Sequence, residues 1–105
     1  GGGRNHQIIG GSVMENKTYL YYEDPGHGWL AVPMDHLVAL GVADKITGYS
    51  YLLGGMAYLE EDCDLGVFVL AYKEKFGRLP NFIQKYQENC HIRHYPNYDY
   101  EKEVV

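Results

Sequence analysis

The segment Tyr58-Leu59-Glu60-Glu61-Asp62-Cys63-Asp64 decides the fold, because a β-prone run here gives way to an amphipathic helix. Downstream of it, apolar residues recur at the spacing of one helix face: Leu65, Phe68, Val69, Tyr72 and Phe76. Asp62 or Asp64 can cap this helix, since unpaired backbone N–H groups at a helix N-terminus favour a carboxylate. Gly77 can close its other end in a left-handed conformation. The pattern therefore predicts the longer helix of the domain.

We call Glu60, Glu61, Asp62 and Asp64 the acidic corner. Upstream of it, a Gly-Gly pair predicts a β-hairpin. The strand-like runs 47–53 and 56–60 flank Gly54 and Gly55, which can adopt the positive φ that a two-residue turn needs. With these glycines at the centre, Tyr51 lies opposite Tyr58. Alternation along the strands then places two sets on opposite faces, with Tyr49, Tyr51 and Tyr58 on one and Leu52, Ala57 and Leu59 on the other.

The remaining elements follow from turn and helix signals. Residues 17–22 and 29–32 are β-prone, and the turn Asp24-Pro25-Gly26-His27-Gly28 joins them into a first hairpin. Residues 33–41 predict a short helix, and residues 81–87 predict a last strand at a sheet edge. The expected fold class is α+β, in the order β-β-α-β-β-α-β. Its mostly antiparallel sheet contains two β-hairpins and a C-terminal strand, with one short and one longer amphipathic helix.

The chain is long enough for one domain of modest core. Residues 1–13 are glycine-rich without periodicity and are interpreted as a vector-derived or disordered leader, with Met14 as a natural start. Residues 14–100 form the expected single α+β domain. Residues 101–105 are expected to be a frayed tail.

Charge and composition limit the kinds of partner and the cellular location that we expect. With 9 Lys and Arg against 14 Asp and Glu, the net charge is −5, which argues against a general nucleic-acid binder and fits a basic protein partner. The sequence shows neither an export signal nor an apolar run long enough for a membrane span, so we expect a cytoplasmic protein without membrane contact. Its two cysteines are then reduced thiols. The 11 tyrosines suit half-buried sheets and interfaces, which also allows a homodimer.

Two clusters carry the candidate functional residues: the acidic corner and the glycine-flanked histidine of the first turn. We expect His27 to be exposed and unpaired at the hairpin tip, with no carboxylate within hydrogen-bonding reach of its imidazole. No catalytic residue, metal ligand or cofactor is assigned. The candidate binding residues combine both clusters with the tyrosine face: Asp24, His27, Tyr49, Tyr51, Tyr58, Glu60 and Glu61.

Three functions remain open, and the first is favoured. It is a non-enzymatic protein-binding module, which presents an acidic surface to its partner. The second is a small metal- or His-dependent hydrolase that uses Asp24, His27 and the 60–64 corner. The spacing of Cys90, His91 and His94 does not match structural zinc knuckles. The third is a single-strand nucleic-acid binder that stacks bases on surface tyrosines.

Four short segments of the sequence also resemble segments of other proteins, and the resemblance spans about Thr18 to Tyr98. They are residues 24–33 (DPGHGWLAVP), 49–51 (YSY), 58–64 (YLEEDCD) and 92–95 (IRHY). In these strings the chain resembles a group of small proteins of unassigned activity that phages, plasmids and other mobile elements encode. The resemblance implies a mobile-element origin and brings no functional residues with it. It favours an acidic inhibitor of a host system as the form of the binding module.

Overall fold

The computed structural model describes residues 14–15 and 17–101, so the expected leader and residues 102–105 of the expected tail lie outside the described residues. Its elements are β1 (Thr18–Glu23), β2 (Gly28–Pro33), α2 (Met34–Ala39), the 3₁₀ turn η1 (Ala43–Lys45), β3 (Tyr51–Leu53), β4 (Met56–Glu60), α3 (Leu65–Phe76), β5 (Asn81–Tyr86) and the 3₁₀ turn η2 (His91–His94). This order confirms the predicted α+β class and the sequence of strands and helices.

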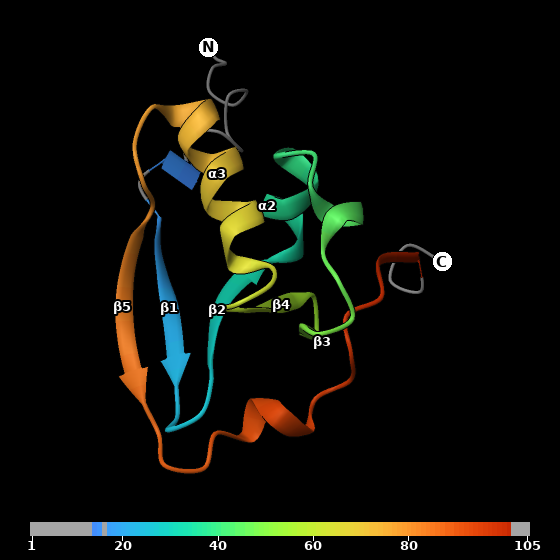
Figure 1. Cartoon of the computed structure of the whole chain (residues 1–105). Helices are drawn as coiled ribbons and strands as arrows, with labels where there is room; N and C mark the ends of the chain where they lie inside the picture. Colours follow the sequence, from blue (N-terminus) through green and yellow to red (C-terminus); the bar gives the residue numbers. More distant parts are fainter. Residues whose placement is uncertain (1–13, 16, 102–105) are drawn as a thin grey trace.

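The strands form one mixed five-stranded sheet in the order β3-β4-β2-β1-β5 (Figure 1). Three neighbouring pairs are antiparallel, whereas β5 runs parallel to β1. The parallel pair arises because α3 carries the chain back along the sheet before β5 begins, as a crossover connection does. β5 is therefore the predicted edge strand.

Both hairpins form as predicted, and the second also has the predicted register. Gly54 and Gly55 have φ values of 58° and 79°, and Tyr51 lies opposite Tyr58. The third strand is shorter than expected, because residues 48–50 turn instead of extending. Polar contacts hold this turn: the Ser50 N–H donates to the Thr47 carbonyl at 3.3 Å, and the side chains of both residues bond to Asp64.

Helices α2 and α3 cover one face of the sheet and close the main core. Phe68 and Tyr72 have no exposed surface, and the ring of buried Tyr19 meets that of Phe68 edge to face at 5.1 Å. α3 ends at Gly77, whose φ is 76° and whose N–H donates to the Lys73 carbonyl at 2.8 Å. The apolar stripe and the helix end therefore agree with the sequence. We call this side of the sheet the helix face.

The acidic corner does not cap α3 in the predicted way. Asp64 occupies the N-cap position, but its carboxylate makes no hydrogen bond to the helix N-terminus. It accepts instead from the Thr47 N–H at 3.1 Å, the Thr47 hydroxyl at 2.8 Å and the Ser50 hydroxyl at 2.5 Å. Asp62 precedes the cap position in the turn. The capping prediction for these two residues is wrong because hydroxyl donors from the turn before β3 reach the Asp64 carboxylate.

The opposite face of the sheet is covered by the segment after β5. Trp29, Cys90 and Ile92 are buried together there, with Tyr51 and Tyr58 packed against them. In Figure 1 this orange-red segment crosses the end of the sheet that lies away from α2 and α3. This segment contains the 3₁₀ turn η2 and reaches the β3 edge through a bridge between Tyr51 and Asn97.

Candidate functional site

A pocket of about 270 Å³ opens on this second face, between the turn of the first hairpin, the end of β4 and η2. Its walls combine aromatic rings with groups of both charges. They are His27, Trp29, Tyr49, Tyr51, Glu60, Asp62, Cys63 and Arg93. We call this side of the sheet the pocket face.

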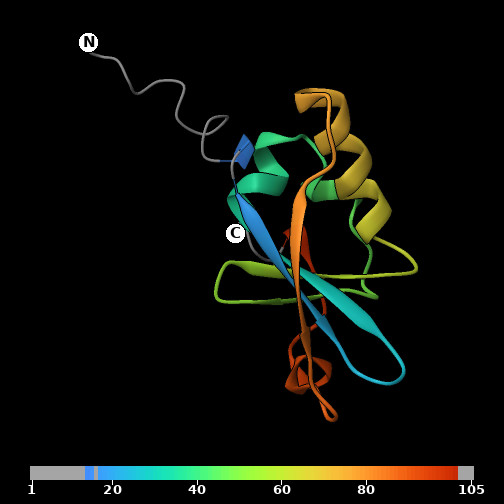
Figure 2. The same ribbon diagram turned by 90° about the vertical axis from the view of Figure 1, so that its left-hand side faces the viewer.

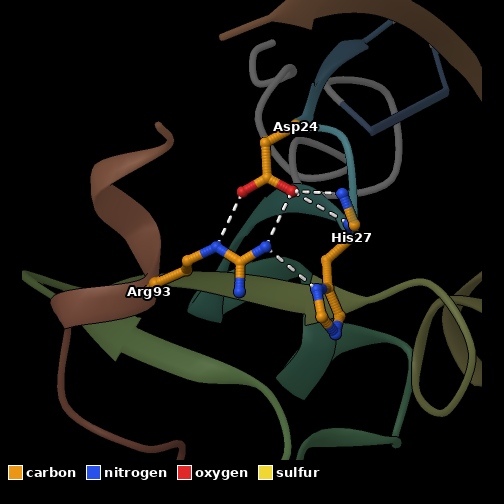
Figure 3. A network of polar contacts seen from close by, with 4 residues as sticks. Asp24, His27 and Arg93 are labelled. Atoms are coloured by element: carbon orange, nitrogen blue, oxygen red, sulfur yellow. Dashed lines mark hydrogen bonds and ion pairs between the residues drawn. The ribbon is translucent and has the colours of Figure 1, made fainter. Parts of the chain in front are cut away.

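Arg93, which lines the pocket, forms an ion pair with Asp24, which does not (Figure 3). Arg93 donates from Nε to Oδ2 of Asp24 at 2.7 Å and from Nη2 to Oδ1 at 2.9 Å. The backbone N–H groups of Gly26 and His27 donate to the same Oδ1 at 3.0 and 2.9 Å. The Asp24 side chain is almost fully buried. The Arg93 contact and the two backbone donors hold the pKa of this carboxyl well below its usual range, and Asp24 in turn raises the pKa of Arg93.

His27 is exposed at the hairpin tip as predicted, and among the described residues no carboxylate bonds to its ring, also as predicted. The prediction that the ring is unpaired is wrong. Its Nδ1 lies 3.0 Å from Nη2 of Arg93, and its ring stacks on Trp29 with centroids 5.9 Å apart. A guanidinium has only donors, so Nδ1 accepts and the ring proton sits on Nε2. Figure 3 shows Nε2 turned away from Arg93. His27 thus presents a hydrogen-bond donor rather than a basic nitrogen to the outside.

Trp29 forms the floor of this arrangement through ring contacts. The Arg93 guanidinium lies 5.5 Å from its ring centroid, and the Tyr51 ring is 6.3 Å away. Such cation–π and aromatic contacts stabilise a buried ring without a hydrogen bond. Within the described part of the chain, the Trp29 Nε1 is the one buried side-chain nitrogen or oxygen that has no hydrogen-bond partner.

The acidic wall of the pocket comes from the end of β4 and the turn after it. Glu60 is 8% exposed, and its carboxylate accepts the Asp62 N–H at 2.9 Å. The neighbouring Cys63 thiol has a raised pKa because of desolvation, its hydrogen bond with Glu60 and the charges of Asp62 and Asp64. A raised pKa keeps Cys63 as a thiol, which is a weak nucleophile and a poor metal ligand.

The structure brings four of the seven predicted binding residues to one pocket: His27, Tyr49, Tyr51 and Glu60. Asp24 acts indirectly, since it holds Arg93. Tyr58 lies on the same face but outside the pocket, where it packs on Tyr95 with ring centroids 5.1 Å apart. The predicted common face of Tyr51 and Tyr58 is therefore present, while Tyr49 belongs to the turn before β3.

Glu61, the seventh predicted binding residue, serves the hairpin instead. Its carboxylate accepts a hydrogen bond from the Tyr21 hydroxyl, and both groups occupy the space that a Cβ on residue 28 would need. Gly28 is therefore required by this close approach and not only by the turn. The carboxylate and desolvation together raise the pKa of Tyr21 above its usual value.

Sequence reasoning missed Arg93 and Trp29 as parts of the site. Arg93 stands 69 residues from its partner Asp24 in a stretch without periodicity, so no local pattern connects them. Trp29 is buried, and it also lines the pocket. The one usable signal was Asp24 itself, because a carboxylate in a tight turn between two strands needs a cation or backbone donors.

Both cysteines are free thiols, with Cys63 exposed and Cys90 buried. Among residues 14–15 and 17–101, no three His, Cys, Asp or Glu side chains are grouped closely enough to hold a metal ion. The helices in that same range are too short and too polar to cross a membrane. In comparisons with known proteins, no family model, no curated protein and no solved structure matches this chain.

Proposed function

We propose that this protein is a non-enzymatic binding module whose pocket receives a basic side chain of a partner protein. The observation that carries the proposal is Glu60, a carboxylate that is 8% exposed and lines the pocket. The described residues offer it no cation, since their one ion pair joins Asp24 and Arg93. Buried carboxylates are normally paired with a cation, so the missing charge is the one a partner would supply.

The charge balance of the pocket supports a cationic ligand. Arg93 is the one Lys or Arg residue in the pocket wall, and Asp24 neutralises it through two hydrogen bonds. Glu60 and Asp62 then remain as the uncompensated charges of the wall. An arginine or lysine side chain would meet attraction from both carboxylates.

The aromatic walls add a second attraction for the same kind of group. Tyr49 and Tyr51 line the pocket beside the acids, and rings of this type attract ammonium and guanidinium groups. Arg93 Nη1 makes none of the contacts that the structure gives to that guanidinium, and Figure 3 shows it pointing away from Asp24 and His27. The Nη1 group of Arg93 can donate a hydrogen bond to a backbone carbonyl next to the bound side chain. A peptide is therefore favoured as the ligand over a free amine.

The setting of this binding event is also part of the proposal. We propose a cytoplasmic protein of mobile-element origin that acts as an inhibitor of a basic host protein. One observation supports the cytoplasmic setting, because both cysteines are free thiols. The mobile-element origin extends the sequence-based expectation raised by the strings at residues 24–33 and 58–64. The three-way arrangement of Asp24, Arg93 and His27 supports binding over hydrolysis, because it leaves His27 without an orienting acid.

Intrinsic fluorescence offers a direct test, because Trp29 is the single tryptophan of the chain and lines the pocket. Argininamide, lysinamide and citrullinamide, the isostere of argininamide whose side chain is neutral, would be titrated into the full chain. We expect a saturable change with the two cationic side chains and none with citrullinamide. Glu60→Gln should weaken argininamide binding about tenfold or more, since glutamine keeps an acceptor for the Asp62 N–H but removes the charge.

Glu74→Gln is the matched control, because Glu74 is an exposed acid on α3 away from this pocket. It removes the same net charge and should leave argininamide affinity unchanged. Equal affinity for citrullinamide, or equal weakening by the two substitutions, would show that no specific cation site exists.

A further inference from the structure

The two edges of the sheet, β3 and β5, differ in whether another described segment covers them. The C-terminal segment covers the β3 edge: the Leu52 N–H donates to the Pro96 carbonyl at 2.9 Å, and the Tyr98 N–H donates to the Ser50 carbonyl at 2.8 Å. Among residues 14–15 and 17–101 nothing covers the β5 edge in this way, and all six residues of β5 are exposed. Figure 2 looks onto this edge and shows no described element outside β5. An open edge of this length is a template for another strand.

Backbone contacts show which residues of β5 face outward. The Gln87 N–H donates to the Glu23 carbonyl at 2.8 Å, so residue 87 points its backbone groups toward β1. Alternation along the strand gives the same direction to residues 81, 83 and 85. Phe82, Gln84 and Tyr86 therefore point their N–H and C=O groups away from the sheet.

We propose that a second copy of this chain pairs with this edge, antiparallel and about a two-fold axis at Gln84. Each Gln84 then pairs with its counterpart, and each Phe82 pairs with Tyr86 of the second copy. In each of these pairs both residues point their backbone groups outward, which an antiparallel hydrogen-bonded pair requires. The two sheets become one continuous sheet, and the interface is isologous, as in most homodimers.

The side chains select this register over its neighbours. Sliding the second copy by two residues in one direction sets Lys85 opposite Lys85, which places like charges face to face. Sliding it in the other direction sets Tyr86 opposite Pro80, which has no N–H to donate. In the proposed register Lys85 lies opposite Ile83, so its charge meets no other charge across the pair.

The same register covers the exposed apolar residues of the strand. Phe82, Ile83 and Tyr86 are 42%, 51% and 61% exposed in the single chain. Pairing Phe82 with the second copy's Tyr86 makes two cross-strand aromatic contacts, which stabilise antiparallel pairs. One six-residue strand pair buries less than the about 1,600 Å² of a standard stable interface. The dimer is therefore weak and forms at high protein concentration.

This dimer does not depend on the proposed function. No residue of β5 lines the pocket, so both pockets stay open when the edges pair. Failure of the argininamide titration would consequently leave the dimer untouched, and the reverse also holds.

The mass of the full chain, measured by sedimentation over a wide concentration range, tests the proposal. The wild type should rise from the monomer mass toward about twice that value. Gln84→Pro should stay monomeric, because proline removes an outward N–H that no hydrogen bond between described residues uses. Gln84→Ala is the matched control, since it loses the same side-chain bond to Glu23 and keeps the N–H, and it should still dimerise. A wild type that remains monomeric, or proline and alanine variants that dimerise equally, would overturn the proposal.

Amide hydrogen exchange of the wild type gives a second readout that needs no variant. In dilute solution Ile83 and Lys85 should be protected by β1, whereas Phe82, Gln84 and Tyr86 exchange fast. In concentrated solution the last three should become protected as well. A dimer in which these three amides still exchange fast would mean that another surface holds it.

Discussion

The two faces of the sheet are stabilised by different kinds of interaction. On the helix face, Leu30, Leu59 and Phe68 have no exposed surface and are held by apolar packing. On the pocket face, a buried tryptophan lies beneath the Asp24–Arg93 pair, and a largely buried glutamate stands near it without a cation. Apolar burial is non-directional and adds up over many contacts, whereas a few polar contacts depend on single partners. The helix face therefore stabilises the domain, whereas the pocket face leaves Glu60 without a cation among the described residues.

The largest expected effect lies on the helix face. Phe68→Ala should lower the free energy of unfolding by about 3–5 kcal/mol, because it leaves a cavity under α3. Leu70→Ala on the same helix is the control, since Leu70 is 61% exposed and should cost less than about 0.5 kcal/mol. Urea denaturation measures both. Similar losses for the two variants would contradict the assignment of the buried helix face.

The next effect lies where the helix face meets the turn before β3. Asp64→Ala should cost about 1–3 kcal/mol, because it leaves the Thr47 N–H and two hydroxyls without their acceptor. Asp62→Ala should be close to neutral, since Asp62 is exposed. If Asp62→Ala were the costlier change in urea denaturation, the capping prediction would be restored and the turn contacts would be secondary.

The smallest of the three effects lies on the pocket face and depends on pH. Folding lowers the Asp24 pKa below its ordinary value of 3.8, so the stabilisation is complete above that pH. It is lost as pH falls through the lowered folded value. Wild type should melt a few degrees above Asp24→Asn near neutral pH, with a difference that shrinks in acid. Exposure of Arg93 keeps the effect small.

Asp35→Asn supplies the control for this pH series, because Asp35 is an exposed acid of the short helix α2. Its melting temperature should follow that of the wild type across the range. An Asp24→Asn difference that stays constant down to about pH 2 would show that the carboxylate charge of Asp24 does not stabilise the fold.

The sequence predictions succeed for local patterns and fail for contacts between distant residues. The stripe that contains Phe68 and Tyr72, the Gly54-Gly55 hairpin and the helix end at Gly77 are local patterns, and each is confirmed. Each depends on residues close together in the sequence, and this is the range over which periodicity and turn residues predict structure. The edge position of β5 also followed from its place in the order of elements.

Contacts between distant residues were not predictable in this way. The capping role of Asp64 failed because Thr47 and Ser50 lie 17 and 14 residues before it. His27 was expected to have no partner because Arg93 lies 66 residues further along the chain. A polar side chain can satisfy its hydrogen bonds with any donor the fold brings near, so sequence alone selects the residue type but not the partner.

Whether the pocket binds a basic side chain can be measured by an NMR titration of the full chain with argininamide, read at every backbone amide and at the Trp29 indole N–H. Shifts are expected at Trp29, Asp62 and Cys63, around the acidic wall, and none at buried helix-face residues such as Leu37. The same titration of Glu60→Gln should need about tenfold more argininamide. Shifts confined to the helix face, or a saturated response that Glu60→Gln leaves unchanged, would contradict the claim that this pocket binds a basic side chain.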